Sequence, residues 1–353
     1  MFNMAQPLFL ITLSTFSALY LAWGVTRLPA ERWQIAAAVP LNKAGDGSWG
    51  GVNLTWYGVL TANAYLAATA LALLLMGAAG ISLRAIVFLV VLLLLCCVPA
   101  SRLVAQVVEK KANTFTVGGA VFIGTLVAPW IVELVNRLAL GDQGDRVPPL
   151  VALSAISIAY AFGEGFGRLA CLSFGCCYGK ALSHCHPRLA RLLAPLALTF
   201  TGKTKKIAYA SQLDGVKVVP VQALTYVLYC GAGLAGCILF LAGSYAASFL
   251  VTLAVTQAWR VVSELLRDDY RGAGRISAYQ IMGILGIAYG FVMAWLFGDD
   301  RSPAADLANG WSLIWSPGTL LALQLLWLVI FLYTGLSRVT AATLRFHVEP
   351  DKV

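Results

Sequence analysis

The sequence predicts an all-α membrane protein that crosses the bilayer about nine times and carries a small extramembrane subdomain. Of its 353 residues, 59% are hydrophobic and only 12% are charged, and the mean hydropathy is +0.79. A soluble protein of this length needs more charge to cover its surface. Apolar runs of about 20 residues, the length that crosses a hydrocarbon core, recur along the chain.

The predicted spans follow one another from the N-terminal region to the C-terminal region. No positively charged residue precedes the first run and no small-residue cleavage site follows it, so we expect a retained helix and not a signal peptide. In chain order, the predicted spans are 7–25, 57–77, 83–100, 117–138, 148–172, 221–243, 246–265, 277–297 and 311–335.

Three connections are long enough to hold structure of their own. Residues 26–56 contain the glycine-rich stretch AGDGSWGG, and residues 298–310 are short and acidic. The longest connection, 173–219, contains PRLARLLAPLAL, which is apolar with arginines on one side. This stretch is either a helix at the membrane interface or the core of a small extramembrane subdomain.

Several charged residues fall inside the spans or at their ends. Glu164 lies four residues before Arg168, and Glu264 lies four residues after Arg260, with Arg267 three residues further on. Residues at these spacings share a helical face. A charge in hydrocarbon costs on the order of 3 kcal/mol and therefore pairs or binds something polar. The two pairs are either internal salt bridges or parts of one cavity in which both arginines bind a phosphate, whose oxygens match guanidinium donors two at a time.

Glycines around the first pair favour the binding interpretation. Gly163, Gly165 and Gly167 recur at every second position, and Gly175 and Gly179 follow. Such a density lets the backbone bend and approach a ligand or a neighbouring helix closely. A purely structural salt bridge does not require it. The chain has no GxxxxGK[ST] phosphate loop.

Cysteines and histidines gather directly after these glycines. Adjacent cysteines reach one tetrahedral zinc ion poorly and no CxxC spacing occurs, and a catalytic cysteine needs a partner that stabilises its thiolate. We therefore expect a disulfide or packing cysteines in a tight turn, and we predict no metal and no cofactor. The residues concerned are Cys171, Cys176, Cys177, His184, Cys185 and His186.

The stretch GRLACLSFGCCYG resembles the signature of the prolipoprotein diacylglyceryl transferase family. Five further segments resemble elements of that family in the same order, between about Leu54 and Gly290: TWYGVL, TVGGAVFIG, VPVQALTY, WRVVSELLRDDYRG and RISAYQIMGI. The resemblance implies a seven-helix transferase-like core at 54–297. Residues 1–53 and 298–353 would each add one extra helix to this core.

The resemblance implies an enzyme of the bacterial inner membrane that uses an anionic phospholipid. Such an enzyme moves the diacylglyceryl group of phosphatidylglycerol to the lipobox cysteine of a pre-lipoprotein and releases glycerol 1-phosphate. Carried over by position, Arg168 and Arg260 would hold the phosphate and Glu264 would orient Arg260. The implied substrate-binding residues are Tyr57, Gly118, Gly119, Glu164, Gly167, Gly179, Gln222, Arg267 and Gln280.

The sequence departs from the family pattern at several positions. Val117 stands where the family has a histidine before Gly-Gly, and Cys171 replaces an asparagine. Thr256 replaces a tyrosine, and Leu224-Thr225 replaces Tyr-Glu. The phosphate-binding half is thus retained better than the acceptor half. We expect the same lipid donor with either another base or another acceptor, such as a lipid or a glycan.

The charge distribution opposes the family's membrane orientation. Of the 25 lysines and arginines, 19 lie in loops on the side of 173–219 and 4 on the opposite side, under the nine predicted spans. The positive-inside rule would place 173–219 in the cytoplasm, whereas the family places this side outside. Basic residues that hold anionic lipid on the outer face would reconcile the two, and we expect the outward orientation.

Two other classes of function remain open from the sequence. An anionic-lipid transporter would use the same arginines as a transit site, but transporters often repeat a broken helix in both halves, and no second glycine-rich arginine segment occurs. A membrane scaffold would have no use for arginines inside its spans. The net charge of +9 suits anionic headgroups, and no nucleic-acid-binding motif is present.

Overall fold

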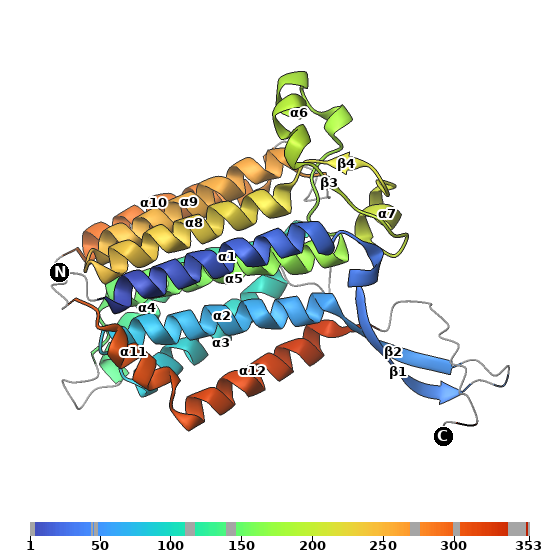
Figure 1. Ribbon diagram of the computed structural model, residues 1–353. Helices are drawn as coiled ribbons and strands as arrows, with labels where there is room; N and C mark the ends of the chain where they lie inside the picture. The colour runs from blue at the N-terminus through green and yellow to red at the C-terminus, as the bar shows by residue number, and fades with distance from the viewer. Residues whose placement is uncertain are drawn as a thin grey trace.

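Nine long helices lie side by side in the computed structural model, each long and apolar enough to cross a membrane (Figure 1). This result, for the residues that the structure describes, confirms the predicted number of spans and the all-α polytopic class. They are α1 (Ala5–Arg27), α2 (Trp56–Ala78), α3 (Leu83–Glu109), α4 (Val117–Leu138), α5 (Pro149–Phe174), α8 (Val221–Leu241), α9 (Tyr245–Leu266), α10 (Ala278–Leu296) and α12 (Pro317–Gly335).

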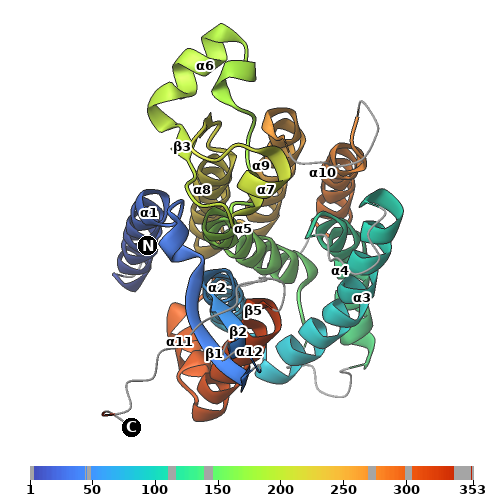
Figure 2. The same ribbon diagram turned by 90° about the vertical axis from the view of Figure 1, so that its right-hand side faces the viewer.

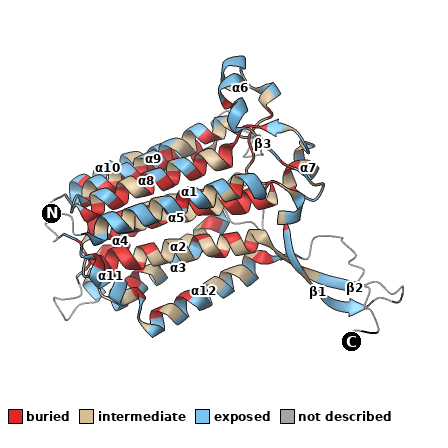
Figure 3. Ribbon diagram, viewed as in Figure 1, coloured by how far each residue is buried: buried red, intermediate tan, exposed pale blue. Residues whose placement is uncertain are grey.

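The structure describes residues 4–43, 45, 49–109, 117–138, 146–268, 276–298, 304–337 and 351. Residues 299–303 of the acidic connection, part of AGDGSWGG, and the basic residues Arg271 and Arg275 after α9 lie outside the described residues. Exposed positions lie mainly on the outer faces of the bundle, and buried positions concentrate along α5 and α8 (Figure 3). This pattern is expected where lipid covers the outer helices.

Helix α5 lies at the centre of the bundle, between α2 and α8 (Figure 2). A Cβ added at Gly163 would lie 2.9 Å from the Ala68 side chain of α2, and one at Gly165 would lie 2.8 Å from the Cys230 sulfur of α8. The alternating glycines therefore let two neighbouring helices approach α5 closely. The helix is continuous from Pro149 to Phe174, and the expected close approach of neighbouring helices at these glycines is confirmed.

The predicted span 311–335 is wrong as a single helix. It consists of a short helix, α11 (Leu307–Ile314), followed by α12. Pro317 begins α12, and the Ser316 side chain accepts a hydrogen bond from the Thr319 amide. A proline ring inside a helix removes a hydrogen bond and clashes with the preceding turn, whereas it fits the first helical position without cost. The predicted span 83–100 is too short, because α3 continues through Pro99 to Glu109.

The connection 173–219 folds as a small head at one end of the bundle, beyond α5 and α8 (Figure 1). The stretch PRLARLLAPLAL forms α6, η4 and the first residue of β3. The elements of the head are η3 (Leu182–His184), α6 (Pro187–Leu193), η4 (Ala194–Leu196), β3 (Leu198–Thr199), α7 (Lys206–Ser211) and β4 (Lys217–Val218), with β3 and β4 antiparallel.

The same end of the bundle carries a β-hairpin that the sequence did not predict. Strands β1 (Ile35–Lys43) and β2 (Trp49–Thr55) pair antiparallel, and β5 (Leu336–Ser337) adds a third strand. The short helix η1 (Glu31–Trp33) connects α1 to this hairpin. In Figure 1 the hairpin extends away from the helices, beyond the ends of α2 and α12.

A buried lysine joins the head to the helices. Lys205 is 0% exposed, and its ammonium group donates hydrogen bonds to the carbonyl of Leu28 at 3.1 Å and the carbonyl of Ser173 at 2.6 Å. These carbonyls lie at the C-terminal ends of α1 and α5, where helices leave acceptors unsatisfied and favour a positive charge. Burial lowers the pKa of Lys205 to about 8, while Glu31 acts in the opposite direction.

Candidate functional site

One face of α5 carries the charged residues that the sequence singled out. Tyr160, Glu164, Arg168 and Cys171 follow one another at spacings of four, four and three residues, so they share a helical face. Arg168 and Glu164 form an ion pair, with 14% and 9% of their side chains exposed. The predicted pairing of these two residues is confirmed.

Arg260 reaches the same carboxylate from α9. Its Nη2 atom lies 4.0 Å from Oε1 of Glu164 and donates a hydrogen bond of 2.8 Å to the Tyr160 hydroxyl. Arg168 and Arg260 each stand six residues before the end of their helix, which places both about 9 Å inside the head end of the bundle. Two guanidinium groups from distant parts of the chain thus meet at one carboxylate.

The buried polar atoms of this cluster are not all satisfied. Within the described part of the chain, Nε of Arg168 and Nε of Arg260 are buried and have no hydrogen-bond partner. Unpaired buried donors are costly and uncommon in folded proteins. Glu164 neutralises one guanidinium group, so one positive charge remains. The donors and the charge together suit an anion.

The expected contact between Arg260 and Glu264 is wrong. Among the described residues, no hydrogen bond or ion pair joins the two, and Glu264 is half-buried. The Arg260 side chain instead lies towards α5, where the buried carboxylate of Glu164 attracts it through a lower dielectric than one near the surface. The orienting role of Glu264 remains a prediction.

The predicted glycines differ in their relation to this cluster. A Cβ at Gly118 would lie 2.8 Å from Nη1 of Arg260, so this glycine of α4 faces the cluster. Gly119 faces Val104 of α3, and Gly167 faces Ala64 of α2. These two glycines therefore face neighbouring helices.

The predicted glutamines hold backbone segments at the same end of the bundle. Gln280 forms a capping box with Ser277 at the start of α10 and donates to the carbonyl of Val261 at 3.1 Å. Gln222 is fully buried and donates to the carbonyl of Cys176 at 2.9 Å. Both amides therefore have structural partners close to the arginine cluster.

Gly179 and Arg267 pair through their backbones in an isolated antiparallel bridge. A Cβ at Gly179 would clash with the carbonyl oxygen of Val219, so a side chain cannot fit at this position. The bridge ties the strand-like segment after α5 to the end of α9. It also holds Arg267 close enough to act electrostatically on Arg168.

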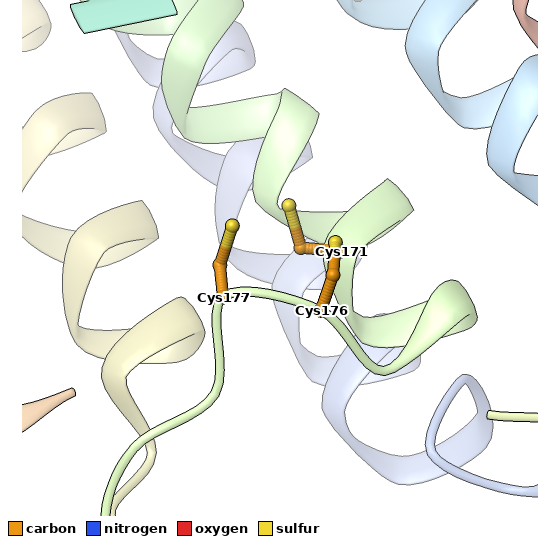
Figure 4. Close-up of side chains that lie close together, drawn as sticks. All are labelled: Cys171, Cys176 and Cys177. Atoms are coloured by element: carbon orange, nitrogen blue, oxygen red, sulfur yellow. The ribbon is translucent and has the colours of Figure 1, made fainter. Parts of the chain in front are cut away.

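Three thiols lie directly beside the arginine cluster. The Cys171 sulfur accepts a hydrogen bond of 3.8 Å from Nη1 of Arg168, and the sulfurs of Cys171, Cys176 and Cys177 all lie within 4.8 Å of one another (Figure 4). No disulfide joins these three cysteines, so of the two expected roles the disulfide is not formed. The predicted Tyr57 is near enough to act electrostatically on this group and on Arg168, and its ring lies 5.8 Å from that of Phe174.

Sequence reasoning missed the tyrosines that hold Arg260. The Tyr160 hydroxyl lies 3.4 Å from that of Tyr229, and Tyr229 donates to the backbone carbonyl of Thr256 at 3.0 Å. The one signal in the sequence was the position of Tyr160, one helical turn before Glu164. Tyr229 comes from α8 and had no such signal in its spacing.

A groove elsewhere in the molecule has a different character. It has a volume of about 500 Å³ and lies between α2 and α12. Its lining is apolar except for Gln324 and the indole of Trp327, which donates to Asn63. It offers no charged ligand for a phosphate. The residues that line it are Leu66, Ala70, Leu320, Leu323, Gln324 and Trp327.

The fold and the site define a multi-pass membrane protein with a buried, positively charged cluster near one end of its bundle. The family model described as prolipoprotein diacylglyceryl transferase matches residues 48–296, and the chain belongs to this family. The chain is similar to the phosphatidylglycerol–prolipoprotein diacylglyceryl transferase of Dehalococcoides mccartyi, with 29% identity over 178 residues. The alignment covers 49% of this chain and 57% of the relative, so less than two thirds of the relative is matched.

Proposed function

We propose that this protein transfers the diacylglyceryl group of an anionic phospholipid, phosphatidylglycerol, to an acceptor thiol and releases glycerol phosphate. The observation that carries the proposal is the meeting of Arg168 and Arg260 at the buried carboxylate of Glu164, with an unpartnered Nε on each arginine among the described residues. Membership of the family and the name of the relative support the same reaction.

The depth of the cluster suits a lipid phosphate. A helix of 26 residues, the length of α5, measures about 39 Å and thus exceeds the hydrocarbon thickness of about 30 Å. Residues about 9 Å from its end stand close to the boundary between headgroups and acyl chains. A phospholipid can bring its phosphate to this level while its acyl chains stay in the bilayer.

The cluster can stabilise the leaving phosphate while its bond to the glycerol carbon breaks. The acceptor sulfur forms a bond to the terminal glycerol carbon of the diacylglyceryl group, and the bond from that carbon to the phosphate oxygen breaks. Its electron pair goes to the departing glycerol phosphate, and the acceptor thiol loses its proton to a base. Arg168 and Arg260 face the growing charge on the phosphate with donors fixed in place. Glu164 and Tyr160 orient these guanidinium groups.

The acceptor is the less constrained part of the reaction. Val117, at the first position of α4, carries no proton-accepting group, so the base comes from another residue or from the acceptor itself. A lipid or glycan acceptor, and transport of an anionic lipid without chemistry, are the alternatives. Both keep the phosphate in the arginine cluster and differ only in the step after binding.

The test incubates purified protein with labelled phosphatidylglycerol, with and without a lipobox peptide, and measures the lipid, the peptide and the released glycerol phosphate. We expect peptide-dependent transfer and equimolar release of glycerol phosphate. Lipid consumption without peptide modification would identify a different acceptor. Unchanged lipid in every arm would contradict the transferase and favour transport.

Arginine variants test the cluster itself. Arg168→Lys and Arg260→Lys keep the charge but lose the planar donor fork, so we expect each to lower turnover by about 100-fold. Arg137→Lys is the matched control, because Arg137 is 76% exposed and pairs with Glu133 of its own helix. Near-normal turnover in both cluster variants would refute the phosphate-binding role.

A further inference from the structure

The thiol cluster of Cys171, Cys176 and Cys177 is not used by the proposed reaction. Cys171 belongs to the last turn of α5, and the other two follow in the turn after the helix. Figure 4 shows the three side chains converging, and each sulfur lies within 4.8 Å of the others. A disulfide would join only two of them. Three thiols around one point have the arrangement of a metal site.

The backbone brings two adjacent cysteines to the same side. In an extended chain neighbouring side chains point in opposite directions, which is why adjacent cysteines look unsuitable in the sequence. Here Gly175 ends α5 with a φ of +70°, and Cys177 has a φ of +55°. The left-handed conformation costs a non-glycine residue roughly 1–2 kcal/mol. Such a cost is typical of positions where the surroundings impose a functional geometry.

We propose that Cys171, Cys176 and Cys177 bind a soft, thiophilic metal ion through three thiolates, and that Cu(I) matches the site best. Metal–sulfur bonds of about 2.3 Å in a trigonal plane separate the sulfurs by about 4 Å. The sulfur atoms lie within 4.8 Å of one another, so small side-chain rotations would bring them to this separation. Thiolate ligands select Cu(I) and zinc over harder cations.

The number of ligands favours the monovalent ion. Structural zinc is almost always four-coordinate, and no histidine or carboxylate joins the three thiols among the residues that the structure describes. Zinc would therefore need a water molecule as its fourth ligand. Cu(I) accepts three sulfurs alone, and each thiol loses its proton to solvent on binding.

The surrounding charge is complementary to such a site. Three thiolates and one Cu(I) carry two negative charges in total, which need compensation when buried. Nη1 of Arg168 lies 3.8 Å from the Cys171 sulfur, and Arg267 is close enough to act electrostatically on Cys177. Two guanidinium groups therefore lie near the two excess charges, although that of Arg168 is shared with Glu164. This arrangement also couples the metal site to an arginine of the phosphate cluster.

The test titrates reduced, purified protein with Cu(I) under anaerobic conditions, in competition with a colorimetric Cu(I) chelator, with Zn(II) in a second arm. We expect one Cu(I) per chain, a sulfur-to-copper charge-transfer band in the ultraviolet, and three sulfur neighbours at about 2.3 Å by X-ray absorption. Cys177→Ser should lower the affinity more than about 100-fold. Cys176→Ser serves as a second variant if the first does not fold.

Cys185→Ser is the matched control, since Cys185 belongs to the same connection but its thiol donates to the carbonyl of Ala181 at 3.6 Å. This variant should bind Cu(I) as the parent protein does. Stoichiometric binding that survives replacement of all three cluster cysteines would overturn the assignment. So would a disulfide within the cluster combined with no metal uptake after reduction. Zinc binding with an oxygen ligand, at the expense of Cu(I), would overturn the choice of ion.

Discussion

The buried Lys205 predicts a specific dependence of stability on pH. Replacing it with methionine removes the ammonium group and keeps an unbranched side chain of similar length. The pKa of Lys205 falls from the ordinary 10.5 to about 8 because burial disfavours the charged form. Between these values the unfolded chain binds a proton that the folded protein has released. Stability therefore rises with pH in this window.

The size of the effect follows from the two pKa values. Below pH 8 the full cost of burying the charge is present, and it is relieved as the pH rises from 8 towards 10.5. By linkage, the free energy of unfolding rises by about 2 kcal/mol between pH 7 and pH 9.5. The full difference between the two pKa values corresponds to about 3 kcal/mol. A gain of this size raises the midpoint of thermal unfolding by roughly 3 °C.

The assay follows thermal unfolding in detergent through the intrinsic fluorescence of the ten tryptophans, at several values of pH from 7 to 9.5. The quantity of interest is the parent protein minus Lys205→Met, because other groups that titrate in this range contribute equally to both. Lys203→Met is the matched control, since Lys203 lies in the same connection and is exposed. The control should keep the slope of the parent. Equal slopes in the parent and in Lys205→Met would refute the reasoning.

Two further predictions concern the site and the packing of α5. Tyr160→Phe removes the hydroxyl that accepts a hydrogen bond from Arg260 at 2.8 Å. A hydrogen bond to a charged group is worth about 1.5–3 kcal/mol, so this variant should fold normally and its turnover should fall about 10- to 100-fold. Unchanged turnover would show that this bond does not position Arg260. Gly165→Leu places a side chain where even an added Cβ would lie 2.8 Å from the Cys230 sulfur. Thermal unfolding should show that this variant is less stable than the parent by about 1–3 kcal/mol. The control Gly231→Leu, on the open side of α8, should leave the stability unchanged.

The sequence predicts the class and the spans well because hydrophobic length is a direct signal of membrane crossing. It fails where the signal is local. Ser316 and Pro317 end one helix and begin the next inside a single apolar run, and hydropathy averages over this break. Pro99, by contrast, lies inside α3 without ending it. The effect of a proline depends on its neighbours in space, which the sequence does not state.

The part of the site whose residues lie on a single helix was predictable from the sequence. The spacing of Glu164 and Arg168 gives their ion pair directly. The partner of Arg260 is not local, because its own helix offers Glu264 at the same spacing, yet the guanidinium group turns to Glu164 on α5. Glu164 and Glu264 thus have the same spacing from an arginine in the sequence but differ in burial in the structure. The same limit explains Lys205, whose two carbonyl partners lie 177 and 32 residues away.

The departure at Val117 lies next to the arginine cluster of the proposed site. Val117 is the first residue of α4, 47% exposed, and the next residue, Gly118, would place a Cβ 2.8 Å from Nη1 of Arg260. A side chain at position 117 therefore stands one residue from the phosphate cluster. The groups that would bind the donor lipid converge around this point, while an imidazole that could deprotonate an acceptor is missing from it. Under the proposed function, retention of one half beside loss of the other assigns the change to the acceptor. The lipid arm of the transfer assay therefore tests the retained half, and the peptide arm tests the changed one.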